Sequence, residues 1–290
     1  MINSKNLSVI LLAATSLIWG TSFILIKKAS LVFAPLEVGA LRVFYAFVAF
    51  IPVFWFYRKK IPNALWAWII LAGLIGSLFP SLLFSWAGSK IQSSLSGMLN
   101  AVTPLFTVLV GTIFFQQKFA LQKWVGLMIG LLGTLILGFM KPGGSLEMNW
   151  FVLPVLFATI LYAFNVNLLK IKFSGIAPLE LSAATVVAVG PIATVILFGF
   201  TDFQYKLFHV EGAIQAAGYV AILGFFGTAF ALVLFNKLIQ ISSPLTASSV
   251  TYIMPIISVL WGLADNEPFG LSQGLGLFGI LIGVFLVNKK

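Results

Sequence analysis

Ala34-Pro35-Leu36-Glu37 decides the fold of this chain, because the same four residues return as Ala177-Pro178-Leu179-Glu180. At this offset of 143 positions, Lys27 falls on Lys170 and Trp19 on Tyr162. Further along the offset is 151, and it relates Gly73, Gly76, Phe79 and Pro104 to Gly224, Gly227, Phe230 and Pro255. The change of offset indicates an insertion, with Thr201–Glu211 longer than its counterpart Arg58–Asn63. The sequence therefore predicts two tandem copies of one unit, residues 1–141 and 142–290.

The composition predicts that lipid surrounds both copies. Hydrophobic residues fill 60% of the 290 positions and charged residues only 8%, which is more apolar surface than a soluble fold of this length hides. Apolar runs long enough to cross a bilayer core of about 30 Å recur along the chain. Each copy contributes five such runs: about 7–26, 36–57, 66–86, 91–115 and 121–140, then 150–170, 179–200, 213–236, 244–264 and 271–288.

An odd number of spans per copy predicts that the second copy enters the membrane upside down relative to the first. The expected fold class is an all-α membrane protein whose ten transmembrane helices form two inverted five-helix repeats. Transporter folds of this kind hold their substrate near the middle of the bilayer, at the interface between the repeats.

The distribution of basic residues predicts the orientation. If the N-terminus is cytoplasmic, eleven Lys and Arg residues fall in cytoplasmic segments and five in outer loops. This bias predicts a multi-pass protein of the inner membrane with both termini in the cytoplasm. The net charge of +10 could suggest binding to nucleic acid, but no basic stripe alternates with exposed stacking aromatics. We therefore expect no nucleic-acid partner.

The first span, Ile18-Trp19-Gly20-Thr21-Ser22-Phe23 with Lys27, resembles the opening motif of the EamA-like family of the drug/metabolite transporter superfamily. Leu41-Arg42, the prolines of the fourth and ninth spans, and Glu267 before a glycine-rich last span extend the resemblance over residues 7 to 288. It implies a ten-helix transporter, often an exporter of amino acids or other small metabolites, with cytoplasmic termini. Gln117 stands in the first copy where Glu267 stands in the second, which is a departure from the acidic pattern.

Polar groups at mid-membrane depth predict a cavity, because they are expensive where they face lipid. The candidate substrate-binding residues are Trp19, Arg42, Ser77, Asn100, Thr103, Tyr162, Asn165, Thr228 and Tyr252. The competing interpretation is that hydroxyls bond back to their own helix and that asparagines join helices. For Arg42 the alternatives are a reach to the outer surface, a pair with Glu37, or attraction of an anionic substrate group such as a carboxylate.

Other residues predict shape and packing. Gly20, Pro104 and Pro255 are candidate hinges, although the prolines equally suit static bends. Lys27 and Lys170 are candidate entrance charges or interface anchors. Small residues recur every fourth position in the fifth and tenth spans, which predicts close packing within a monomer or a homodimer contact. They are Gly126, Gly130, Thr134 and Gly138, then Gly279 and Gly283.

The sequence lacks the residues that several classes of function require. No Asp or Glu lies at mid-membrane depth, there is no cysteine, and His209 stands alone in a loop. We therefore expect neither a buried proton relay nor a metal, cofactor or intramembrane enzyme site. The alternative on the same fold is a sugar-phosphate or nucleotide-sugar exchanger, which calls for two or three basic groups at the cavity. A non-transporting scaffold is a further alternative, but it has no need for inverted halves.

Overall fold

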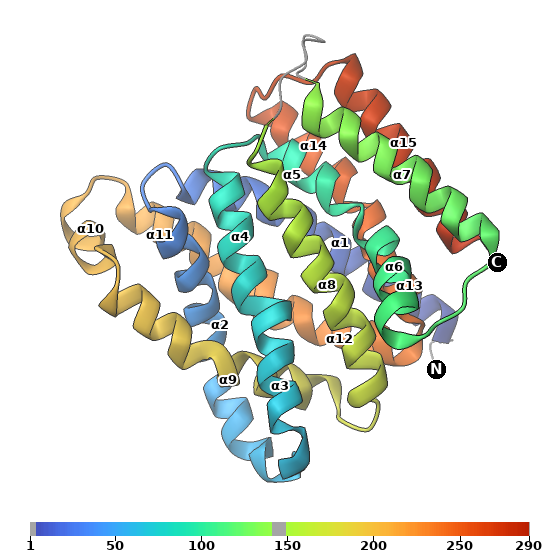
Figure 1. Cartoon of the computed structure of the whole chain (residues 1–290). Coiled ribbons are helices and arrows are strands. Elements are labelled where there is room, and N and C mark those ends of the chain that lie inside the picture. Colours follow the sequence, from blue (N-terminus) through green and yellow to red (C-terminus); the bar gives the residue numbers. More distant parts are fainter. Residues whose placement is uncertain (1–3, 141–148, 290) are drawn as a thin grey trace.

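The computed structural model describes residues 4–140 and 149–289, and every regular element in these ranges is helical (Figure 1). The expected boundary between the copies, at residues 141 and 142, lies outside the described residues. The first copy contains α1 (Ser4–Ala29), α2 (Pro35–Tyr57), α3 (Trp66–Gly73), α4 (Phe79–Gly88), α5 (Ser93–Asn100), α6 (Thr103–Phe115) and α7 (Leu121–Phe139). The second contains α8 (Val152–Lys172), α9 (Pro178–Gly199), α10 (Phe203–His209), α11 (Ala213–Ile222), α12 (Ala231–Ile241), α13 (Pro244–Ser248), α14 (Met254–Ala264) and α15 (Leu271–Asn288).

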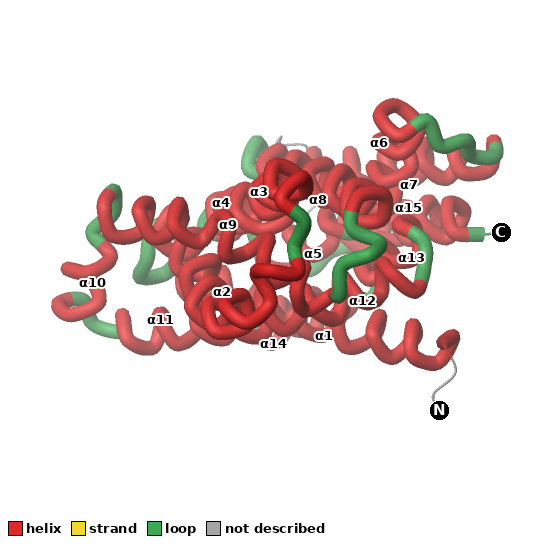
Figure 2. Tube along the Cα trace, turned by 90° about the horizontal axis from the view of Figure 1, so that it is seen from below, coloured by secondary structure: helices red, strands yellow, loops and turns green. Residues whose placement is uncertain are grey.

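These helices form ten spans long and apolar enough to cross a membrane, which confirms the expected all-α membrane protein. The spans are Asn6–Ala29, Pro35–Lys60, Asn63–Gly88, Ser93–Phe115, Leu121–Phe139, Val152–Lys172, Pro178–Gly199, Ala213–Ile241, Pro244–Ala264 and Leu271–Asn288. The insertion in the second copy forms the short helix α10. The first helix begins and the last helix ends on the same side of the molecule (Figures 1 and 2).

The two copies pack in an exchanged pattern. The second spans of both copies, α2 and α9, lie against each other, and so do the fifth spans, α7 and α15 (Figure 1). Helix α1 contacts α12 and α14, while its counterpart α8 contacts α4 and α6. These contacts between the copies therefore come in pairs in which the roles are reversed, as a pseudo-twofold axis requires.

The small residues of the fifth and tenth spans face each other within this chain. A Cβ on Gly283 would lie 2.5 Å from the carbonyl oxygen of Gly126, and a Cβ on Gly133 would lie 2.6 Å from that of Gly276. Because these distances are far below van der Waals contact, the two helices reach this separation only with glycine at the crossing. The glycine faces of α7 and α15 thus serve packing between the repeats.

Four spans depart from a regular α-helix at matching places in the two copies. In the third and eighth spans the chain forms π-helical turns, over Leu74–Leu78 and Leu223–Phe230. In the fourth and ninth spans the helix is interrupted, between α5 and α6 and at the 3-10 turn Ser249–Tyr252.

Pro104 and Pro255 occupy the first turns of α6 and α14, directly after these interruptions. A proline in the first turn gives up an N–H that has no partner within the helix, so here each proline starts a helix segment rather than bending a continuous one. The third candidate hinge, Gly20, serves close packing, because a Cβ there would lie 2.7 Å from Cβ of Ile257 on α14.

Candidate functional site

A cavity of about 840 Å³, including the part open to solvent, lies between the two copies. Most of its lining consists of residues that the two sequence offsets relate to each other. These pairs are Trp19 and Tyr162, Ser22 and Asn165, Phe23 and Val166, Gly76 and Gly227, Ser77 and Thr228, Phe84 and Phe235, Asn100 and Thr251, and Thr103 and Met254. The cavity therefore lies on the pseudo-twofold axis.

Aromatic rings form two walls of the cavity, and each wall pairs one ring of the first copy with one ring of the second. The rings of Trp19 and Phe235 lie 4.9 Å apart between centroids, and those of Phe84 and Tyr162 lie 5.9 Å apart in a stacked arrangement. The repeat exchanges these two pairs, because Trp19 corresponds to Tyr162 and Phe84 to Phe235. Such ring pairs present rigid, mostly apolar faces to a ligand.

The π-helical turn of the eighth span supplies the main polar contacts. The Gly227 carbonyl oxygen accepts hydrogen bonds from Trp19 Nε1 at 2.8 Å and from Arg42 Nη2 at 3.3 Å. Arg42 Nε donates to Thr228 Oγ1 at 2.8 Å. A π-turn leaves carbonyl groups without their usual helical partners, and here side chains of the first copy satisfy one of them.

The structure brings eight of the nine candidate substrate-binding residues together around this cavity. Tyr252 is the exception, because its hydroxyl donates to the Val284 carbonyl and accepts from Asn288, both on α15. Its neighbour Thr251 lines the cavity instead. Within the 3-10 turn at Ser249–Tyr252, the Thr251 side chain faces the cavity and the Tyr252 side chain faces α15.

Arg42 makes neither of the structural contacts considered for it. It is only 8% exposed and turns to the cavity, while Glu37 accepts from Lys206 Nζ at 2.8 Å. Several hydroxyls do bond back to backbone, as Thr103 does to Asn100 at 2.7 Å. Among the described residues, neither the Ser77 hydroxyl nor the buried Asn165 Oδ1 has a hydrogen-bond partner.

Apolar lining residues escaped the sequence analysis. Phe23, Phe84, Phe235 and Ile26 all face the cavity. In a chain with 29 phenylalanines, residue type does not distinguish a cavity wall from a lipid-facing side chain. The available signal was position, because Phe84 and Phe235 are separated by the same offset as the matched glycines.

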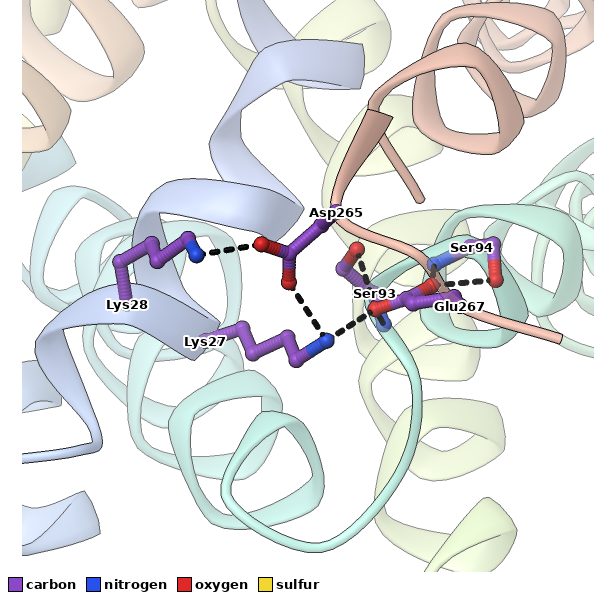
Figure 3. A network of polar contacts seen from close by, with 6 residues as sticks. All are labelled: Lys27, Lys28, Ser93, Ser94, Asp265 and Glu267. Carbon is purple, nitrogen blue, oxygen red and sulfur yellow. Dashed lines mark hydrogen bonds and ion pairs between the residues drawn. The ribbon is translucent and has the colours of Figure 1, made fainter. Parts of the chain in front are cut away.

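An ion-pair network closes over one end of the fourth span (Figure 3). Lys27 Nζ lies 2.8 Å from Asp265 Oδ2 and 2.8 Å from Glu267 Oε1, and Lys28 also pairs with Asp265. The Glu267 carboxylate accepts from the backbone N–H groups of Ser93 and Ser94, at 2.8 and 3.0 Å, and from both hydroxyls, at 2.9 and 2.6 Å. We call these six residues the Lys27 cluster. It joins α1 and the start of α5 in the first copy to the segment between α14 and α15 in the second.

Both acids of the Lys27 cluster are held in the ionised form. The hydrogen bonds from Lys27 and Lys28 lower the pKa of Asp265. Burial of Glu267 by itself raises its pKa, but the hydrogen bonds from Lys27, Ser94 and Ser93 outweigh burial, so its pKa also lies below the ordinary value. Placing a carboxylate at the N-terminus of α5 also suits the helix dipole.

The related end of the other copy has a similar turn, one residue longer, without the ion pairs. The backbone N–H of Gln117 donates to the Gly111 carbonyl at 2.9 Å, as that of Glu267 donates to Gly262 at 2.8 Å. Gln117 Nε2 then donates to Asn167 Oδ1 at 2.9 Å. Lys170 instead donates to the carbonyls that end α12, including that of Ser242 at 2.7 Å. Neither Lys27 nor Lys170 is among the residues that line the cavity.

The sequence of both copies matches a known protein family. A model of the EamA-like transporter family matches residues 6–139 and again residues 149–289. The chain belongs to the EamA-like transporter family. Because that family consists of transporters, the coarse function of the chain is transport by a multi-pass membrane protein.

Individual relatives agree along the whole length. The chain is 22% identical to an uncharacterized transporter of Archaeoglobus fulgidus, over 97% of this chain and 98% of that protein. It is 26% identical to the uncharacterized inner membrane transporter YedA of Escherichia coli K12, over 96% and 89%. A crystal structure with 16% identity shares the fold, with a TM-score of 0.65 over 97% of this chain and 96% of that one.

Proposed function

We propose that the chain is a secondary transporter that moves small organic metabolites, such as amino acids, out across the cytoplasmic membrane by alternating access. The cavity lined by matching residues of both copies carries this proposal. If two inverted halves exchange conformations, a cavity on their pseudo-twofold axis opens first to one side of the membrane and then to the other. The outward direction and the amino-acid class rest on the family resemblance.

Reconstitution tests the proposal. Purified protein in liposomes should move at least one labelled compound from a panel of amino acids, sugars and phosphorylated metabolites. Trp19→Ala and Tyr162→Ala should each reduce that flux by about fivefold or more, because each removes an aromatic wall worth about 1 kcal/mol or more. Trp150→Ala is the matched control, since Trp150 is 65% exposed and does not line the cavity. Flux that persists undiminished in both cavity variants would remove these walls from the substrate path.

The charge of the cavity favours this proposal over a sugar-phosphate or nucleotide-sugar exchanger. Phosphate groups are bound by several charge-assisted hydrogen bonds, which calls for more than one cation. Arg42 is the one Lys or Arg among the lining residues, and Lys27 and Lys170 have partners elsewhere. Flux of phosphorylated compounds alone from the panel would reverse this preference.

A further inference from the structure

Arg42 breaks the symmetry of a cavity that is built mostly from matched pairs. Its counterpart at the offset of 143 is Thr185 on α9. Thr185 is absent from the cavity lining, and its hydroxyl donates to Leu181 and Ser182 of its own helix. The cavity therefore has one cation on one side of its axis and no matching charge on the other.

The hydrogen-bonding capacity of Arg42 is only partly used. A guanidinium has five N–H donors, and here Nε and one N–H of Nη2 bond to Thr228 and Gly227. Within the described part of the chain, Nη1 has no hydrogen-bond or ion-pair partner. Two hydroxyls that line the same space, Ser77 and Tyr162, likewise bond to no described residue. The cavity thus presents several unused donors.

Among the described residues, no carboxylate balances this charge. The described residues that line the cavity include neither Asp nor Glu. Four described acids have partners elsewhere: Glu37 pairs with Lys206, Asp265 and Glu267 belong to the Lys27 cluster, and Glu180 pairs with Lys60. An unpaired cation at this depth in a membrane is costly, and a bound anion removes that cost.

We propose that the cavity selects a small amphipathic organic monoanion, whose carboxylate binds Arg42 and whose apolar part lies between the aromatic walls. The proposal deepens the proposed transport function and rests on it. One guanidinium matches one carboxylate as a two-pronged donor. A substrate ammonium finds only neutral acceptors, such as Asn165 Oδ1. Amino-acid zwitterions should therefore bind more weakly than the anion with the same carbon skeleton, and amines more weakly still.

Three compounds that share a phenylethyl unit and differ in charge test the selection. They are 3-phenylpropionate, phenylalanine and 2-phenylethylamine, and their affinities for wild-type protein in lipid nanodiscs can be measured by titration calorimetry. We expect 3-phenylpropionate to bind tightest, phenylalanine less tightly, and 2-phenylethylamine at least about tenfold more weakly than the anion. This series needs no variant, so it stands even if a change at Arg42 impairs folding.

Variants then assign the selection to one residue. Arg42→Gln should weaken 3-phenylpropionate at least about tenfold and abolish the order among the three compounds, whereas Arg42→Lys should preserve the order with reduced affinity. Lys90→Gln removes one positive charge from an exposed position away from the cavity and should leave the series unchanged. Circular dichroism and a monodisperse elution profile verify that each variant is folded.

The outcomes separate the two proposals. Binding of phenylalanine or 2-phenylethylamine at least as tight as 3-phenylpropionate overturns the charge selection, while flux of labelled metabolites in liposomes would still support transport. Failure of wild-type protein to bind any of the three compounds also overturns the selection. Absence of flux for the whole metabolite panel overturns the transport proposal itself.

Discussion

Glu267→Gln should loosen the contact between the two copies that the Lys27 cluster makes next to Ile26, a residue that lines the cavity. Glutamine keeps the size of the side chain, which is 3% exposed, but it removes the charge that pairs with Lys27. Its amide nitrogen must also face the backbone N–H of either Ser93 or Ser94, where only an acceptor fits, although the neighbouring hydroxyl can turn to accept from it. Losing one buried charge-assisted contact and opposing one backbone donor costs about 3 kcal/mol, or about a hundredfold in an equilibrium between the joined and the separated cluster.

Thiol labelling measures this change, because the chain has no native cysteine. Ile26 lines the cavity one residue before Lys27 and is only 2% exposed, so a cysteine there should react slowly while the cluster is intact. In the Ile26→Cys background, Glu267→Gln should raise the rate of reaction with a membrane-impermeant maleimide by tenfold or more. Glu180→Gln is the control, since it removes a carboxylate whose partner Lys60 is 62% exposed and whose pair is worth little.

The labelling result can contradict the reasoning directly. If Glu267→Gln lowers the thermal midpoint but leaves the labelling rate at position 26 unchanged, the cluster stabilises the fold without controlling access. If both quantities match those of Glu180→Gln, the buried carboxylate contributes far less than its contacts indicate.

Two further predictions concern pH and helix packing. Because the pKa values of Asp265 and Glu267 are both lowered, the stability from the Lys27 cluster is present above the ordinary carboxyl pKa and lost as pH falls through the lowered one. The thermal midpoint should thus show no loss from this source between about pH 8 and pH 5 and a fall below about pH 4, and that fall should be smaller in Glu267→Gln; a midpoint that already falls from this source near pH 6 would contradict the assignment. Gly283→Ala should destabilise the protein by about 1–3 kcal/mol, because its Cβ would lie 2.5 Å from the Gly126 carbonyl oxygen, whereas Gly274→Ala on the same helix meets nothing within 4 Å. Equal thermal midpoints for these two variants would show that α7 and α15 can separate at little cost.

The sequence was sufficient for the spans, the repeat and most of the polar lining of the cavity. Hydropathy predicts the ten spans because lipid selects for uninterrupted apolar runs, and the inverted pattern follows from five spans per copy. Trp19 and Tyr162 were identifiable because large amphipathic rings at mid-span, at matched positions, are rarely placed against lipid. The structure adds that they stand in symmetric pairs with Phe235 and Phe84.

The contacts of charged residues could not be predicted in the same way. The pair between Lys27 and Asp265 joins residues 238 positions apart, and no local pattern selects that partner over an exposed position. Arg42 was considered as a partner of Glu37 because the two lie close in sequence. The structure instead directs it to the Gly227 carbonyl, which lies within the π-turn of the eighth span. Neither π-turn is visible in hydropathy.

The widened turns also bear on the history of the gene. They occur at Leu74–Leu78 and Leu223–Phe230, which correspond under the offset of 151, so one ancestral five-helix chain carrying the turn accounts for both. Two such chains, inserted in opposite directions, would have formed a symmetric cavity between them. The two positions now held by Arg42 and Thr185 would then have carried the same residue. On this account the lone guanidinium became possible only after fusion, when each half could diverge without changing the other.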